Sequence, residues 1–96
     1  MERQFLLRNL NVSWQIEIDN SVAKFLKRIP QKDADRLSDV LTEFESSPFA
    51  GDIIKLSGEE NSWRRRVGSY RIFYKVYSEQ SVILIQELQR RGSKTY

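Results

Sequence analysis

The chain has 96 residues, a net charge of +3 and 40% hydrophobic residues, which suits one compact domain over residues 1–96 and argues against a disordered chain. It contains neither cysteine nor histidine, which excludes disulfides, thiolate zinc sites and histidine-based acid–base catalysis. No apolar run approaches the ~20 residues that a membrane helix needs. We therefore expect a soluble cytoplasmic protein without membrane contact, metal or other cofactor.

Basic residues are concentrated in the second half of the chain. Residues 1–48 contain seven Lys and Arg against eight Asp and Glu, whereas residues 49–96 contain nine against five. Guanidinium groups bind phosphate oxygens through paired N–H donors. This uneven distribution predicts a polyanionic partner such as a nucleic acid.

The first half predicts one strand and two helices. Residues 1–12 show little periodicity and are expected to form a loosely ordered leader. Residues 13–18 alternate apolar and polar side chains, as a half-buried strand does. Two amphipathic helices follow, the first capped by Asp19 or Asn20 and ended by a proline, the second over residues 31–46. Together they predict a helical hairpin with one apolar side.

The second half predicts the sheet on which this hairpin packs. Short apolar or alternating segments bounded by turn residues indicate strands at residues 53–56, 63–67, 70–77 and 82–88. Gly68-Ser69 suits a tight hairpin turn between the middle two. The fold class is therefore α+β: an N-terminal strand, a helical hairpin, then antiparallel strands that form one twisted sheet with the helices packed on one face.

Several segments within this order resemble the RelE/ParE toxin superfamily. The most specific is W-R-R-R-V-G-S-Y-R-I-F-Y at residues 63–74. Shorter matches lie at residues 14–19, 26–30, 55–58 and 90–91, so the resemblance covers about residues 13–96. It implies a RelE-like fold and a toxin of a type II toxin–antitoxin system.

The resemblance also implies an activity and its partners. The family's ribonucleases hold mRNA in the A site of the 30S ribosomal subunit and cleave it by attack of a 2′-hydroxyl on the adjacent phosphate. The implied partners are mRNA, the ribosome and a cognate antitoxin, with operator DNA contacted only through the antitoxin. By position, the catalytic set is Arg64, Arg66, Arg71, Arg91 and Tyr96. The RNA-binding set is Lys55, Arg64, Arg66, Arg90, Arg91 and Lys94. The spacing between Arg91 and Tyr96 departs by one residue from the family's pattern.

Strand geometry supports part of this set independently. Side chains alternate along a strand, so Arg64 and Arg66 are expected on one sheet face and Arg65 on the other. Fixed guanidinium groups stabilise the charge that builds up at phosphorus without transferring a proton themselves. Tyr96, Glu87 or a water molecule remains as the proton acceptor. The competing interpretation is that these arginines form only the solvated face of an antiparallel sheet.

Other residues in this region have structural interpretations. Arg65 falls where the family has an apolar residue, so it must either extend to the sheet rim or lie in a bulge. Arg71 has two interpretations, catalysis or a structural ion pair with Glu87. The aromatic side chains around them are expected in the core: Trp63, Tyr70 and Tyr74.

Two other functions remain open. A ParE-like poison of DNA gyrase would share the fold, although that branch tends to lack the full set of phosphate-binding arginines. A non-catalytic basic module would bind nucleic acid in a salt-sensitive way without cleaving it. Growth arrest on expression in bacteria separates the toxins from the module.

Overall fold

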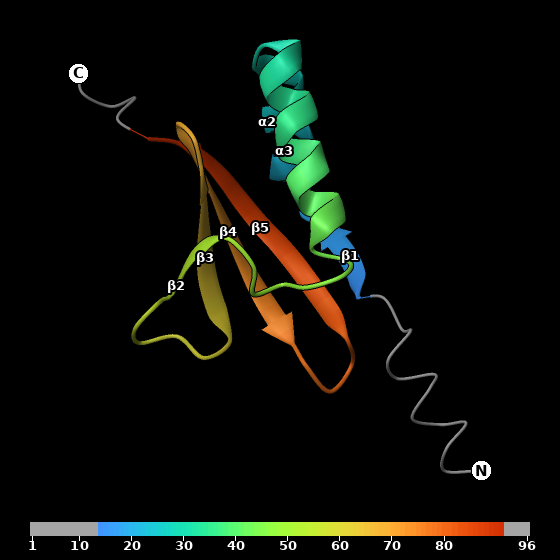
Figure 1. Ribbon diagram of the computed structural model, residues 1–96, viewed down its shortest axis with the longest axis vertical. Coiled ribbons are helices and arrows are strands. Elements are labelled where there is room, and N and C mark those ends of the chain that lie inside the picture. Colours follow the sequence, from blue (N-terminus) through green and yellow to red (C-terminus); the bar gives the residue numbers. More distant parts are fainter. Residues whose placement is uncertain (1–13, 92–96) are drawn as a thin grey trace.

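The computed structural model describes residues 14–91, which form an α+β fold of two layers (Figure 1). The elements in chain order are β1 (Gln15–Ile18), α2 (Asn20–Arg28), α3 (Gln31–Glu43), β2 (Asp52–Lys55), β3 (Ser62–Val67), β4 (Tyr70–Tyr77) and β5 (Val82–Arg90). The expected leader at residues 1–12 lies outside the described residues. Neither helix in residues 14–91 is long and apolar enough to cross a membrane.

All five strands join one sheet, in the order β1-β5-β4-β3-β2. Strands β2 to β5 pair antiparallel, as predicted, and β1 pairs parallel with β5 at one edge. Helices α2 and α3 lie on one side of the sheet, toward its β5 and β1 edge (Figure 1). The predicted fold class is therefore confirmed, and the N-terminal strand makes the sheet mixed.

Local sequence signals set the helix boundaries. The Asp19 carboxylate accepts a hydrogen bond from the Ser21 N–H at 2.9 Å, which caps α2 and lowers the pKa of Asp19. Ile29 is extended because it precedes Pro30, so α2 ends and α3 starts around the proline. Helix α3 ends at Glu43, three residues before the predicted end, and a turn follows it.

The core lies between the helices and the strand face that they cover. Both helices direct their apolar stripes to the sheet, and the largest fully buried side chains are Tyr74, Phe44, Leu37, Ile72, Ile83, Ile85 and Val22. Tyr70 is also buried, and Trp63 packs against this cluster while partly exposed. The expected core position is thus confirmed for Tyr70 and Tyr74, whereas Trp63 lies at the edge of the core. The Tyr70 hydroxyl donates to Asp33 at 2.7 Å and so links β4 to α3.

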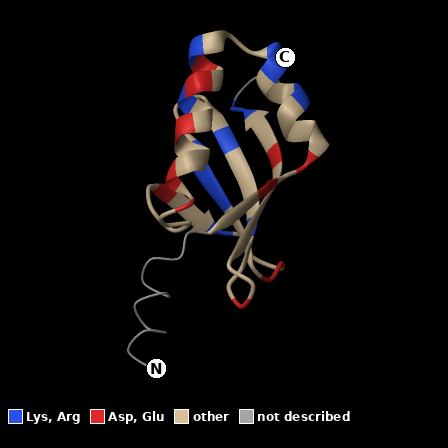
Figure 2. Ribbon diagram, turned by 90° about the vertical axis from the view of Figure 1, so that its right-hand side faces the viewer, with Lys and Arg blue, Asp and Glu red and all other residues tan. Residues whose placement is uncertain are grey.

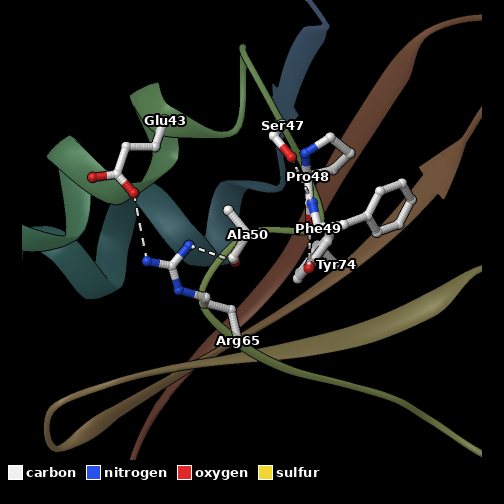
Figure 3. A network of polar contacts seen from close by, with 7 residues as sticks. All are labelled: Glu43, Ser47, Pro48, Phe49, Ala50, Arg65 and Tyr74. Atoms are coloured by element: carbon white, nitrogen blue, oxygen red, sulfur yellow. Dashed lines mark hydrogen bonds and ion pairs between the residues drawn. The ribbon is translucent and has the colours of Figure 1, made fainter.

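Arg65 extends to the rim of the core (Figure 3). Its guanidinium donates to the Ala50 carbonyl oxygen at 3.0 Å and pairs with Glu43 at 3.5 Å. Gly51 has a φ of +87°, a left-handed conformation that favours glycine, and a Cβ there would also contact the Arg65 guanidinium. The first of the two interpretations of Arg65 is therefore confirmed, since the register shift of the sheet lies elsewhere, between Phe73 and Tyr74.

Tyr74 makes folding depend on pH in the alkaline range. Burial raises its pKa to about 12 from 10.0, and the nearby Arg65 partly opposes this shift. Between pH 10 and 12 the unfolded chain releases the phenolic proton while the folded chain retains it. The free energy of unfolding should therefore fall by up to about 1.4 kcal/mol per pH unit in that window.

We expect Tyr74→Phe to flatten this decline. At pH 7 the variant should lose about 1 kcal/mol of stability, because the Pro48 carbonyl loses a hydrogen bond of 2.7 Å. Urea unfolding of both proteins at pH 7, 10 and 11 tests this expectation. Tyr70, whose pKa burial also raises, contributes equally to both proteins. Parallel stability curves above pH 10 would contradict the assignment to Tyr74.

Candidate functional site

The sheet face opposite the helices, called the open face below, carries the basic side chains. Burial alternates along β4, the central strand, because its even-numbered residues enter the core. Its odd-numbered residues point to the open face and are half-buried: Arg71, Phe73, Lys75 and Tyr77. In Figure 2, Lys and Arg colour extended parts of the strands, and Asp and Glu lie mainly on the helices and at loop tips.

The register between β3 and β4 brings three arginines together. Arg66 lies directly opposite Arg71, and Arg64 lies opposite Phe73, diagonal to Arg71. Opposite residues in antiparallel strands have Cβ atoms about 4.5–5.5 Å apart, and diagonal neighbours are about 7–8 Å apart. Three guanidinium groups can therefore reach one phosphodiester. As predicted from alternation, Arg64 and Arg66 share this face and Arg65 faces the helices.

The electrostatics of this cluster are unbalanced. Arg66 pairs with Asp52 at 3.1 Å, but both side chains are about half exposed, so this ion pair contributes little to stability. Within residues 14–91, Arg64 and Arg71 have no hydrogen-bond or ion-pair partner, and the Nε atom of each is buried without an acceptor. Such donors cost stability until an acceptor reaches them. Phosphate oxygens would satisfy them.

The ion pair considered between Arg71 and Glu87 does not form. The register sets Arg71 opposite Gln89 and sets Glu87 opposite Phe73. The Glu87 carboxylate instead accepts a hydrogen bond from the Gln89 amide at 3.0 Å. The structural explanation for Arg71 is therefore wrong in this form, and its guanidinium stays available on the open face.

A bulge in β5 decides where the last arginines point. The ladder pairs Tyr74 with Ile85 and Phe73 with Glu87, which leaves Gln86 unpaired. The Ser21 hydroxyl donates to the Gln86 carbonyl oxygen at 3.2 Å, which links the bulge to α2. Beyond the extra residue, alternation reverses, so Leu88 is buried.

This reversal separates Arg90 from Arg91. Arg90 lies opposite Tyr70, and its Cζ atom is 5.6 Å from the centre of that ring, on the helix-covered face. The Arg91 N–H continues the ladder to Ser69, and its guanidinium donates to the Gly68 carbonyl oxygen at 3.3 Å. Alternation directs Arg91 to the open face, at the end of the sheet where Arg66 and Arg71 lie.

Of the remaining predicted site residues, the described Lys55 does not reach this cluster. Lys55 is opposite Trp63 and so shares the helix-covered face, at the edge strand. Lys94 and Tyr96 lie outside the described residues, so their roles stay predictions. Three further residues on the open face were not predicted from the sequence: Phe73, Lys75 and Tyr77. The alternation along residues 70–77 that places Arg71 on this face also places them there. In residues 14–91, no three His, Cys, Asp or Glu side chains are grouped as metal ligands.

Most of the chain is similar in sequence to known toxins. A family model described as ParE toxin of type II toxin-antitoxin system, parDE, matches residues 16–94. The curated toxin RelE1 of Methanocaldococcus jannaschii is 26% identical over 83 residues, which cover 83% of this chain and 92% of the relative.

Solved structures of RelE toxins are also similar to this chain. A chain of the archaeal RelE–RelB complex from Pyrococcus horikoshii matches with a TM-score of 0.76 and 30% identity, covering 83% of this chain and 97% of that one. The isolated E. coli RelE toxin matches with a TM-score of 0.71 at 19% identity, covering 83% and 86%, which shows the shared fold alone.

Repulsion between the arginines of the open face should lower the stability of the folded protein. Replacing Arg71 by the shorter, neutral Gln removes one of two like charges that face each other across β3 and β4. We expect the free energy of unfolding to rise by about 0.2–1 kcal/mol at low ionic strength. The gain should shrink in ~1 M salt, where exposed charges are screened within about 3 Å.

Urea unfolding at the two salt concentrations measures this effect. Arg65→Gln is the matched control, since it removes the same charge from the same sheet but also loses the bonds to Ala50 and Glu43. The control should be less stable than the parent chain. A loss of stability in Arg71→Gln at low salt would contradict the proposed repulsion.

Proposed function

The chain belongs to the RelE/ParE superfamily of toxins from type II toxin–antitoxin systems, and from this premise we propose that it is an endoribonuclease that cleaves mRNA in the ribosomal A site. The observation that supports this proposal most strongly is the cluster of Arg64, Arg66 and Arg71 on the open face, where two guanidinium groups have no acceptor within residues 14–91. Arg91 follows β5, and the alternation beyond the bulge at Gln86 directs it to the same face.

In the proposed reaction, the 2′-hydroxyl attacks the adjacent phosphorus and the bond to the 5′-oxygen of the next nucleotide breaks. The products are a 2′,3′-cyclic phosphate and a free 5′-hydroxyl. Negative charge grows on the non-bridging oxygens and on the leaving oxygen, where the arginines stabilise it without giving up a proton. Positioning of the two reacting groups supplies much of the remaining acceleration.

A proton must also leave the attacking hydroxyl and another must reach the leaving oxygen. Tyr96, Glu87 or water accepts the first in this scheme, and water supplies the second. Glu87 is an exposed carboxylate on the open face. It lies opposite Phe73 on β4, and Arg64 lies opposite the same Phe73 on β3. Arg90 and Lys55, which lie on the other face, take no part in the reaction scheme.

We further propose that a cognate antitoxin binds this chain and holds it inactive in the cytoplasm. The support is that similar structures include a toxin bound to its partner, the RelE–RelB complex of Pyrococcus horikoshii at 30% identity. An antitoxin carboxylate would satisfy the free donors of Arg64 and Arg71 as a phosphate does. This competition would explain how protein binding prevents RNA binding.

A second candidate function is poisoning of DNA gyrase. It is favoured by the family model, whose description names ParE and the parDE system. The arginine cluster argues against it, because two of its members, Arg64 and Arg71, have no partner within residues 14–91 and gyrase poisoning does not require groups that bind a reacting phosphate. The two functions give different cellular products, cut mRNA in one case and a DNA-damage response in the other.

Controlled expression in bacteria, with mRNA 5′ ends mapped by primer extension, tests the proposal. We expect cuts at fixed positions within codons, only in translated messages, and growth arrest. In Arg64→Ala/Arg71→Ala/Arg91→Ala, cleavage should fall at least about 100-fold, the usual loss when one donor to transition-state charge is removed.

The matched control removes three positive charges from the helices instead. Lys24→Ala/Lys27→Ala/Lys32→Ala replaces exposed side chains of α2 and α3 and should cleave like the parent chain. Arrest with intact mRNA and an induced DNA-damage response would move the assignment to gyrase. Arrest-free growth with intact mRNA would contradict both candidate functions.

A further inference from the structure

The open side of β4 alternates cationic and aromatic residues: Arg71, Phe73, Lys75 and Tyr77. We propose that this strand is a stacking track for single-stranded RNA, in which the rings of Phe73 and Tyr77 bind bases, Lys75 contacts a phosphate between them and Arg71 contacts a phosphate on the other side of Phe73. The inference deepens the proposed function and rests on it for the identity of the nucleic acid. It assigns two binding residues outside the catalytic set.

Spacing along the strand supports this assignment. Alternate residues of an antiparallel strand are about 6.8 Å apart, which allows one nucleotide of an extended chain per pair of residues. The cation–ring repeat covers four residues, about 13.6 Å, and therefore corresponds to about two nucleotides, so the two rings can bind alternate bases while the cations contact neighbouring phosphates. Sheet-borne aromatic side chains that stack two or three bases are an established solution in RNA-binding domains.

The surroundings of Phe73 indicate a binding role rather than a core role. Its ring is not part of the core cluster, which occupies the opposite face. It is flanked along the strand by Arg71 and Lys75 and lies opposite Arg64 on β3. A half-buried aromatic side chain among three cations, none of which makes a hydrogen bond or ion pair within residues 14–91, is suited to a base whose phosphates those cations bind.

The track has a direction relative to the arginine cluster. Arg66, Arg71 and Arg91 lie at the Gly68-Ser69 end of the sheet, and β4 leads from there to Tyr77. Phe73 adjoins the cluster, and Tyr77 is about 14 Å farther along the strand. Val82 lies opposite Tyr77 and Leu84 lies opposite Lys75, so apolar side chains of β5 line the open face at the Tyr77 end of β4. Phe73 would thus hold a base next to the cut, and Tyr77 one about two nucleotides away.

The test uses a fluorescein-labelled single-stranded RNA decamer with 2′-methoxy groups, which block cleavage, and fluorescence anisotropy of the full chain without ribosomes. Phe73→Leu keeps an apolar side chain without the ring and should weaken binding about tenfold or more. The slope of log Kd against log salt should stay the same, because no phosphate contact is lost. Arg64→Ala should instead change that slope by about 0.7.

Two comparisons make the readout specific to stacking. Phe73→Tyr keeps a ring and should bind within about twofold of the parent chain. A decamer with one abasic nucleotide, moved stepwise along the strand, should bind the parent chain more weakly at particular positions. In Phe73→Leu, an abasic nucleotide at one of those positions should no longer weaken binding. In Tyr77→Leu, the same should hold for a different position. Thermal unfolding of each variant verifies that it is folded.

Equal RNA affinity of folded Phe73→Leu, Tyr77→Leu and the parent chain would overturn the inference, as would an abasic effect that does not depend on these rings. If the rings matter only for capture of the antitoxin, they belong to a protein interface and the inference fails. Ring-dependent RNA binding by a chain that cuts no mRNA in cells would leave the track standing and refute the ribonuclease. Cleaved mRNA in cells, together with RNA binding that does not depend on the rings, would support the ribonuclease and refute the stacking track.

Discussion

The structure depends on one constraint: within the described residues, helices cover only one face of the five-stranded sheet. Side chains alternate along each strand, so this cover sends every second residue into the core and leaves its neighbours on the open face. On β4 the same eight residues supply Ile72, Tyr74 and Val76 to the core and a row of cations and rings to the other side. The hydrophobic packing that stabilises the fold thereby also positions the candidate site.

Adjacent arginines show how far the face decides what a residue does. Arg65 faces the helices, where it binds the Ala50 carbonyl and Glu43 and closes the rim of the core. Both arginines leave a buried Nε without an acceptor, but Arg64 faces the other way, and its whole guanidinium has no hydrogen-bond or ion-pair partner within residues 14–91. The bonds of Arg65 stabilise the folded chain. The unbonded guanidinium of Arg64 costs stability, and a ligand that supplies oxygen acceptors would satisfy it. The guanidinium groups of Arg64 and Arg71, which share the open face and have no partner within residues 14–91, are therefore the strongest physical argument for an anionic partner.

The bulge at Gln86 is the second determinant of the site. Because one residue of β5 has no partner, the alternation set by Ile83 and Ile85 is reversed before the strand ends. Without it, Arg91 would point to the helices and Arg90 to the open face. The bond between Ser21 and the Gln86 carbonyl ties this local irregularity to α2. A helix on the covered face thus influences which arginine reaches the open one.

The sequence by itself determined the class of fold, the order of elements, their bounds to within a few residues and the shared face of Arg64 and Arg66, because periodicity, caps and turn residues are local signals. The resemblance of residues 63–74 to the RelE/ParE toxins was likewise visible in the chain, and the comparisons confirm it. Only the tertiary structure decided the parallel pairing of β1, the rim position of Arg65, the absence of an Arg71–Glu87 pair and the opposite faces to which Arg90 and Arg91 point. Each of these depends on register between strands distant in sequence, and register is set by how the whole sheet packs against its helices.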